Sequence, residues 1–233
     1  MPRPWTTQVL LLFFVSLVLT GCGNPRSEKQ ALDGFNAILI TVDTLRADHL
    51  ESYGYSGVRT PAINKLAADG VVFRQDIAQV PLTIPSHCSI LTGLWPNATG
   101  VRDQAGFRLA PDKVTLAKAL QAAGWQTAAF IGSSILNSET GLGQGFDTYT
   151  NVTGGDKGPA EEGLERRGDQ VMADALRWIE TPGRARFFVW IHLFDPHTPY
   201  AAPEPYRTQY ARTPYDGEIA YVDSLIGQLT GSL

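Results

Sequence analysis

Cysteine is scarce in this sequence, because only two of the 233 residues are cysteines, Cys22 and Cys88. One pair cannot form the disulfide framework typical of small secreted domains. An excess of positive charge is also missing, since 19 lysines and arginines face 23 aspartates and glutamates and the net charge is −4. This balance excludes a basic surface for nucleic acid, so we expect no nucleic-acid partner. The sequence also lacks internal repeats and low-complexity segments.

Residues 9–19 are almost wholly apolar and too few to cross a membrane as a helix. Arg3 precedes this run, and leucine, threonine, glycine and then Cys22 end it. This order is typical of a signal peptide that ends in a bacterial lipobox, so we predict a signal peptide over residues 1–21 and a lipid on Cys22. An ordinary signal peptide with an incidental cysteine is the alternative. Residues 22–35 are polar and predict a lipid-anchored tether.

A lipid on Cys22 would attach the protein to the membrane of the cell envelope. Gly23 follows Cys22 where aspartate would signal retention at the inner membrane. For a Gram-negative source, we therefore expect an outer-membrane lipoprotein that faces the periplasm. Cys88 then has no intramolecular partner, and we interpret it as a small buried packing residue.

Apolar strands alternate with helices from residue 36 onward. The first strand is almost continuously apolar, as expected of a strand buried on both faces of a parallel sheet. We predict an α/β fold in which helices flank a largely parallel central sheet. The expected strands cover residues 36–43, 71–73, 126–131 and a run from 187, and the expected helices cover 62–69, 86–94, 115–123, 169–180 and 215–229.

Residues 81–96 place a threonine near the start of one of these helices. Pro85 suits the first turn of a helix, where its missing N–H costs little, and Gly93 is a stop signal. Thr83 therefore lies at or just before the helix N-terminus, where free N–H groups and the helix dipole favour an anion. A hydroxyl at this position can attack a phosphate or sulfate ester. The alternative is that Thr83 only caps the helix.

The same stretch resembles the signature of the sulfatases, a family within the alkaline phosphatase superfamily. That signature is Cys or Ser, any residue, Pro, Ser and Arg, followed by a helix that ends in Leu-Thr-Gly. Here the two parts read Thr83-Ile84-Pro85-Ser86-His87 and Leu91-Thr92-Gly93. Threonine cannot be oxidised to formylglycine, so we expect no formylglycine, and the resemblance implies that Thr83 itself is the nucleophile. His87 replaces the arginine, and we expect it to orient Thr83.

Asp43 matches the first metal ligand of the sulfatase family. It ends the first predicted strand, and open α/β sheets bind ligands beyond the carboxyl ends of their strands. A carboxylate in this place suits a divalent cation. The resemblance implies a calcium, magnesium, manganese or zinc ion held by Asp43 and Thr83. The alternative is that Asp43 only caps a turn.

A further match follows the strand that begins at residue 187. The segment Pro196-His197-Thr198-Pro199-Tyr200 resembles the family's Pro-His-x-Pro-Tyr, whose histidine contacts the ester and assists the leaving group. We assign this role to His197, and a turn histidine is the alternative. By the same resemblance, Gln104 replaces an asparagine that binds the substrate. Arg102 is a candidate clamp for the anion, with a solvated surface arginine as the alternative.

The resemblance covers about residues 36–230, and we predict residues 36–233 to be an alkaline-phosphatase-like sandwich domain that is truncated at its C-terminus. The family continues with a strand ending in Asp-His-Gly that completes the metal site, and no Asp-His pair follows residue 200. The family also carries Gly-Lys-Trp-His-Leu-Gly, whose lysine and histidine contact the sulfate. This chain instead reads Gly132-Ser133-Ser134-Ile135-Leu136.

These observations favour a metal-dependent hydrolase that acts on a sulfate ester of a small molecule or glycan. A phosphomono- or phosphodiesterase of the same superfamily is one alternative, because a threonine nucleophile resembles the phosphodiesterase branch. The other alternative is a truncated, inactive envelope lipoprotein with a binding role.

Overall fold

The structure is a computed structural model that describes residues 34–151, 165–183 and 186–233. Residues Asn36–Leu233 form one compact unit. The predicted signal peptide, Cys22 and nearly all of the predicted tether lie outside the described residues, so these assignments stay predictions. Within the described ranges, no helix combines the length and the apolar character that a membrane span requires.

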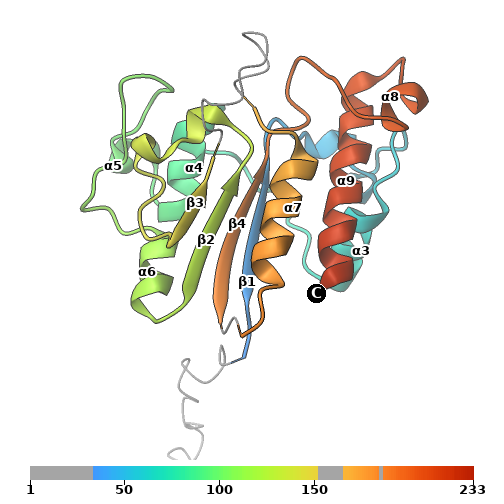
Figure 1. Ribbon diagram of the computed structural model, residues 1–233. Helices are drawn as coiled ribbons and strands as arrows, with labels where there is room; N and C mark the ends of the chain where they lie inside the picture. Colours follow the sequence, from blue (N-terminus) through green and yellow to red (C-terminus); the bar gives the residue numbers. More distant parts are fainter. Residues whose placement is uncertain (1–33, 152–164, 184–185) are drawn as a thin grey trace, which may run out of the picture. The chain divides into compact units, whose positions relative to one another are not determined.

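A parallel sheet forms the centre of this unit (Figure 1). Its strands in the described part of the chain are β1 (Ala37–Val42), β2 (Gln126–Ile131), β3 (Thr148–Thr150) and β4 (Phe187–Leu193). Their spatial order is β1-β4-β2-β3, and every pairing is parallel. Because β4 lies between β1 and β2, residues far apart in the sequence become neighbours, and Thr41 pairs with His192.

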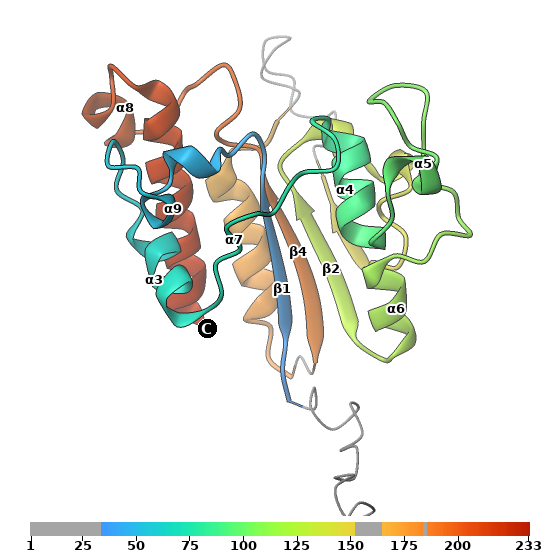
Figure 2. The ribbon, with the colours of Figure 1, turned by 180° about the vertical axis from the view of Figure 1, so that it is seen from behind.

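Helices cover both faces of the sheet, as the two opposite views show (Figures 1 and 2). α7 (Gly168–Ile179) and α9 (Pro214–Ser232) pack on one face, with α3 (Pro61–Asp69) against α9. α4 (Thr83–Thr92) and α6 (Leu116–Ala122) pack on the other face. The shorter elements are α5 (Pro96–Thr99), α8 (Tyr206–Gln209), η1 (Ala47–His49), η2 (Glu51–Tyr53), η3 (Ser134–Leu136) and η4 (Ser138–Thr140). This arrangement confirms the predicted α/β fold.

The central strand β4 is buried along its whole length. Alternate residues from Phe187 to Leu193 belong to the core under α7 and α9, whereas Phe188 and Trp190 belong to the core under α4 and α6. Successive side chains of a strand point to opposite faces of the sheet. His192 therefore lies on the same face as Trp190, which is the face that α4 covers.

Two predicted elements differ from the structure. The helix predicted over residues 86–94 begins earlier, at Thr83, because the backbone of Leu82 is extended and Pro85 is accepted in the first turn. Residues 71–73 are not a strand. Val71 is 80% exposed, and no strand of the described residues pairs with this segment, so its apolar side chains do not join a sheet.

Candidate active site

Asp43 and Thr83 meet at the carboxyl edge of the sheet. β1 leads directly into Asp43, whose N–H extends the parallel ladder by donating to the carbonyl of Leu193 at 2.9 Å. Thr83 is the first residue of α4, and its Oγ1 donates to Oδ2 of Asp43 at 3.4 Å. The structure thus brings two predicted site residues together at the sheet edge where α/β proteins bind ligands.

The side chain of Thr83 does not cap α4. Leu82 occupies the cap position, and no side chain makes a capping hydrogen bond there. One N–H of the first turn, that of Ile84, instead donates to Oε1 of Gln104 at 2.8 Å, which satisfies a group that helix geometry leaves free. The hydroxyl of Thr83 is therefore free to face the Asp43 carboxylate, and the capping alternative for Thr83 is wrong.

His87 holds the first turn of α4 from within the core. Its Nδ1 lies 2.7 Å from the carbonyl oxygen of Thr83, and its Nε2 lies 3.2 Å from Oγ1 of Thr41, which also accepts from Nε1 of Trp190 at 2.9 Å. All three bonds form when Nδ1 carries the hydrogen and the Thr41 hydroxyl donates to Nε2. Burial lowers the pKa of His87 and favours this neutral form. His87 thus contacts the backbone of Thr83 and not its hydroxyl.

Thr44, which follows Asp43, has a left-handed backbone with φ of 51°. This conformation costs a β-branched residue about 1–2 kcal/mol. Two bonds hold it in place: the N–H of Thr44 donates to Oδ1 of Asp43 at 2.9 Å, and its hydroxyl donates to the carbonyl of Pro196. The first bond fixes one carboxylate oxygen of Asp43 and leaves Oδ2 for the contact with Thr83.

The atoms around Asp43 fit a divalent cation. Its Oδ2 lies 3.4 Å from the hydroxyl of Thr83 and 3.7 Å from Nε2 of His192. Carboxylate, hydroxyl and imidazole donors are all found in sites for divalent metals. No group of three or more His, Cys, Asp or Glu side chains in the described residues is placed to hold a metal ion. The described residues thus offer Asp43, Thr83 and His192 as donor groups, without a complete set of metal ligands.

Two other predicted site residues contact aromatic rings. His197 stacks on Phe194 with ring centroids 4.3 Å apart, and its Nδ1 is 2.7 Å from the next carbonyl oxygen. Arg102 is exposed, and its guanidinium lies 5.9 Å from the ring centroid of Phe107. The hydrogen bonds and ion pairs of the described residues join neither side chain to Thr83. The active-site roles assigned to His197 and Arg102 therefore stay predictions.

A pocket of about 640 Å³ borders the start of α4. Ile84 and Gln104 line it beside Thr83, and Arg108 brings a positive charge to it. The other lining residues are Gly106, Phe107, Ile135, Asn137, Glu139 and Thr140. Motif spacing does not identify Arg108, because this residue lies in irregular chain between elements. Arg108 is recognised as a pocket residue only from the fold, which brings its segment close to the start of α4.

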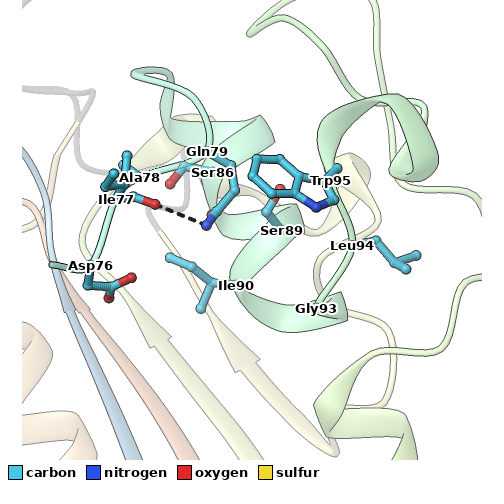
Figure 3. Close-up of a pocket in the computed structure, with 10 residues that line it drawn as sticks. All are labelled: Asp76, Ile77, Ala78, Gln79, Ser86, Ser89, Ile90, Gly93, Leu94 and Trp95. Carbon is cyan, nitrogen blue, oxygen red and sulfur yellow. Dashed lines mark hydrogen bonds between the residues drawn. The ribbon is translucent and has the colours of Figure 1, made fainter. Parts of the chain in front are cut away.

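A second pocket, of about 440 Å³, opens along the outer side of α4 (Figure 3). Ile77 and Trp95 contribute apolar surface to it, and Ser86 and Ser89 line it from the helix. Figure 3 shows that the segment carrying Ile77 runs opposite this side of the helix. Thr83 lines neither pocket, and this one also lacks Ile84 and Gln104, the two residues joined at the first turn of α4, so we do not include it in the candidate active site.

Glu218 is a buried acid on α9, near the loop that follows β4. It is 2% exposed, its Oε1 accepts from the N–H of Ala201 at 2.6 Å, and its Oε2 has no hydrogen-bond partner among the described residues. Burial, together with the charges of Asp195 and Glu165, raises the pKa of Glu218 to about 8. The folded protein therefore keeps a proton on Glu218 at neutral pH.

We expect Glu218 to make the free energy of unfolding fall as the pH rises from 4.5 to about 8, because the unfolded chain releases this proton first. Glu218→Gln should remove this part of the pH dependence of the free energy of unfolding, which is on the order of 4 kcal/mol between acid pH and pH 8. Urea unfolding at several pH values measures it. The exposed Glu180→Gln is the matched control and should keep the wild-type slope. An unchanged slope in Glu218→Gln would contradict the assignment.

Comparisons with known proteins identify the family of this chain. The family model described as Sulfatase matches residues 36–233. N-acetylglucosamine-6-O-sulfatase of Bacteroides thetaiotaomicron is 34% identical over 145 residues, which make up 62% of this chain and 25% of that protein. Steryl-sulfatase of Mus musculus is 31% identical over 137 residues, or 54% of this chain and 22% of that protein. The chain spans about a quarter of the length of these curated relatives.

Solved structures share the fold. The phosphonate monoester hydrolase of Agrobacterium radiobacter superposes with a TM-score of 0.70 at 19% identity, over 85% of this chain and 59% of that one. The crystal structure of Ps i-CgsB gives a TM-score of 0.73 at 20% identity, over 85% and 54%. At these identities the likeness to solved structures concerns the fold alone. The family match, by contrast, covers the whole compact unit. The chain belongs to the sulfatase family, within the alkaline phosphatase superfamily.

Proposed function

We propose that this chain is the nucleophile-bearing part of a metal-dependent hydrolase of sulfate esters. The observation that carries the proposal is the meeting of Thr83 with Asp43, in which a hydroxyl at the start of α4 lies 3.4 Å from a carboxylate at a strand end. A helix N-terminus favours negative charge on a bound ester. Membership of the sulfatase family supports sulfate as that ester.

Asp43 and Thr83 would hold the cation in this mechanism. That cation would lower the pKa of the hydroxyl and withdraw charge from the ester oxygens. Oγ1 of Thr83 loses its proton to solvent and attacks sulfur as the bond from sulfur to the alcohol oxygen breaks. Water then cleaves the sulfate from Thr83. His197 gives a proton to the leaving alcohol, which requires the turn after β4 to approach the ester.

A sulfated glycan is the proposed substrate class. One relative is named N-acetylglucosamine-6-O-sulfatase, and a solved complex with the substrate D-glucosamine-2-N,6-O-disulfate superposes at a TM-score of 0.65 and 27% identity. The pocket beside Gln104 offers groups that recognise a sulfated sugar, namely the cation of Arg108, the amide of Asn137 and the carboxylate of Glu139.

A phosphate ester hydrolase is the second candidate. Thr83 is the observation that favours it, because threonine cannot become formylglycine and must attack through its own hydroxyl. The sequence Gly132-Ser133-Ser134-Ile135-Leu136, which lacks the family's sulfate-contacting lysine and histidine, points the same way.

An assay of the full-length protein on both ester classes distinguishes the candidates. We expect sulfate release from 6-O-sulfated N-acetylglucosamine to exceed phosphate release from bis(p-nitrophenyl) phosphate, and EDTA to abolish both. Faster phosphate release would favour the second candidate. If neither ester is hydrolysed with calcium, magnesium, manganese or zinc, the hydrolase proposal is wrong.

A further inference from the structure

His192 is a buried imidazole without a hydrogen-bond partner. Its side chain is 0% exposed, and neither ring nitrogen has a partner within the described residues. An unpaired buried polar group costs about 1–3 kcal/mol, and native structures seldom keep one without a reason. An apolar side chain would fill the same position in β4 without this cost. The ring therefore points to a ligand that is not a protein group.

The ring of His192 lies beside the residues that carry the proposed chemistry. Its centroid is 4.9 Å from that of His87, which holds the first turn of α4. Its Nε2 is 3.7 Å from Oδ2 of Asp43, which is too long for a hydrogen bond. The same Oδ2 lies 3.4 Å from Oγ1 of Thr83. One carboxylate oxygen thus has an imidazole nitrogen and a hydroxyl at similar distances.

Such spacings are typical of donor atoms that share one cation. Bonds of about 2.1 Å to nitrogen and about 2.2 Å to oxygen, at a tetrahedral angle, place the two donors about 3.5 Å apart. We propose that Nε2 of His192 ligates the divalent cation held by Asp43 and Thr83. An imidazole ligand favours zinc over calcium or magnesium, which prefer oxygen. The inference rests on the metal dependence in the proposed function and adds a ligand to that site.

Isothermal titration of the EDTA-treated full-length protein with Zn²⁺ and with Ca²⁺ tests this ligand. We expect His192→Gln to weaken Zn²⁺ binding at least about tenfold and to change Ca²⁺ binding much less. His49→Gln is the matched control. His49 pairs with Asp216 at 2.7 Å, and no hydrogen bond or ion pair of the described residues joins it to Asp43, Thr83 or His192, so its loss should leave both affinities unchanged.

Pulsed EPR of the Cu²⁺-loaded protein gives a second measurement, because it detects imidazole nitrogens bound to the metal. We expect such couplings in the wild-type protein and a weaker nitrogen signal in His192→Gln. A wild-type spectrum without imidazole couplings overturns the proposal even if the variant fails to fold.

The outcomes separate this inference from the proposed function. Unchanged Zn²⁺ affinity and nitrogen couplings in His192→Gln, together with metal-dependent hydrolysis by the wild-type protein, overturn the ligand role alone. A wild-type protein that binds none of these metals overturns the ligand role and the metal dependence together.

Discussion

Thr83→Ala is expected to reduce ester hydrolysis at least about 10³-fold while the protein stays folded. Alanine removes the hydroxyl that donates to Oδ2 of Asp43. The fold should persist because this side chain caps no helix, and the N–H of Ile84 keeps its bond to Gln104. Steady-state kinetics of the full-length protein measure the loss, and thermal unfolding verifies the fold.

Thr83→Ser is the matched variant, because serine keeps the oxygen and loses only the methyl group. We expect it to retain hydrolysis within about tenfold of wild type, since the attacking atom is still present. A Thr83→Ala protein with wild-type kcat would remove Thr83 as the nucleophile for sulfate and phosphate esters alike.

Asp43→Asn is the second change with a large expected effect. Asparagine keeps an oxygen that can accept from the N–H of Thr44, but it loses the negative charge that would hold the cation. We expect hydrolysis to fall at least about 10²-fold and stimulation by added metal to disappear. Initial rates of the EDTA-treated full-length protein, measured against metal concentration, report both effects.

Asp69→Asn provides the control for the loss of one carboxylate. Asp69 is exposed at the end of α3 and pairs with Lys65, so its replacement should leave the metal response unchanged. If Asp43→Asn keeps both the wild-type rate and the metal response, the cation is held elsewhere and the proposed site is wrong.

Local patterns predict most of the helices and strands. The predicted strand over residues 126–131 matches β2 residue for residue, because glycines at both ends bound its run. The strand order does not follow from such patterns. β4 lies between β1 and β2 in the sheet. Parallel strands are joined by a crossover connection, and the local sequence pattern does not determine beside which strand the crossover places the next one.

The residues of the candidate site also fall into two groups, those that a local sequence pattern identifies and those whose position depends on the fold. Asp43 and Thr83 each follow a local signal, a strand end and a helix start, so the sequence is sufficient to find them. Motif matching also selects His197 and Arg102, but tertiary packing places their side chains on Phe194 and Phe107. A motif identifies a residue type at a spacing, whereas the direction of its side chain depends on the neighbours it packs against.

The sequence by itself determined the α/β class, the family and the pair Asp43 and Thr83, because strand burial, helix starts and motifs are encoded over a few residues. Only the tertiary structure placed His192 beside the candidate site. Its place in an apolar strand indicates a structural residue. The parallel pairing of Thr41 with His192 brings its ring beside Asp43 under α4. That pairing joins two distant segments, and long-range contacts of this kind arise from the packing of the whole sheet.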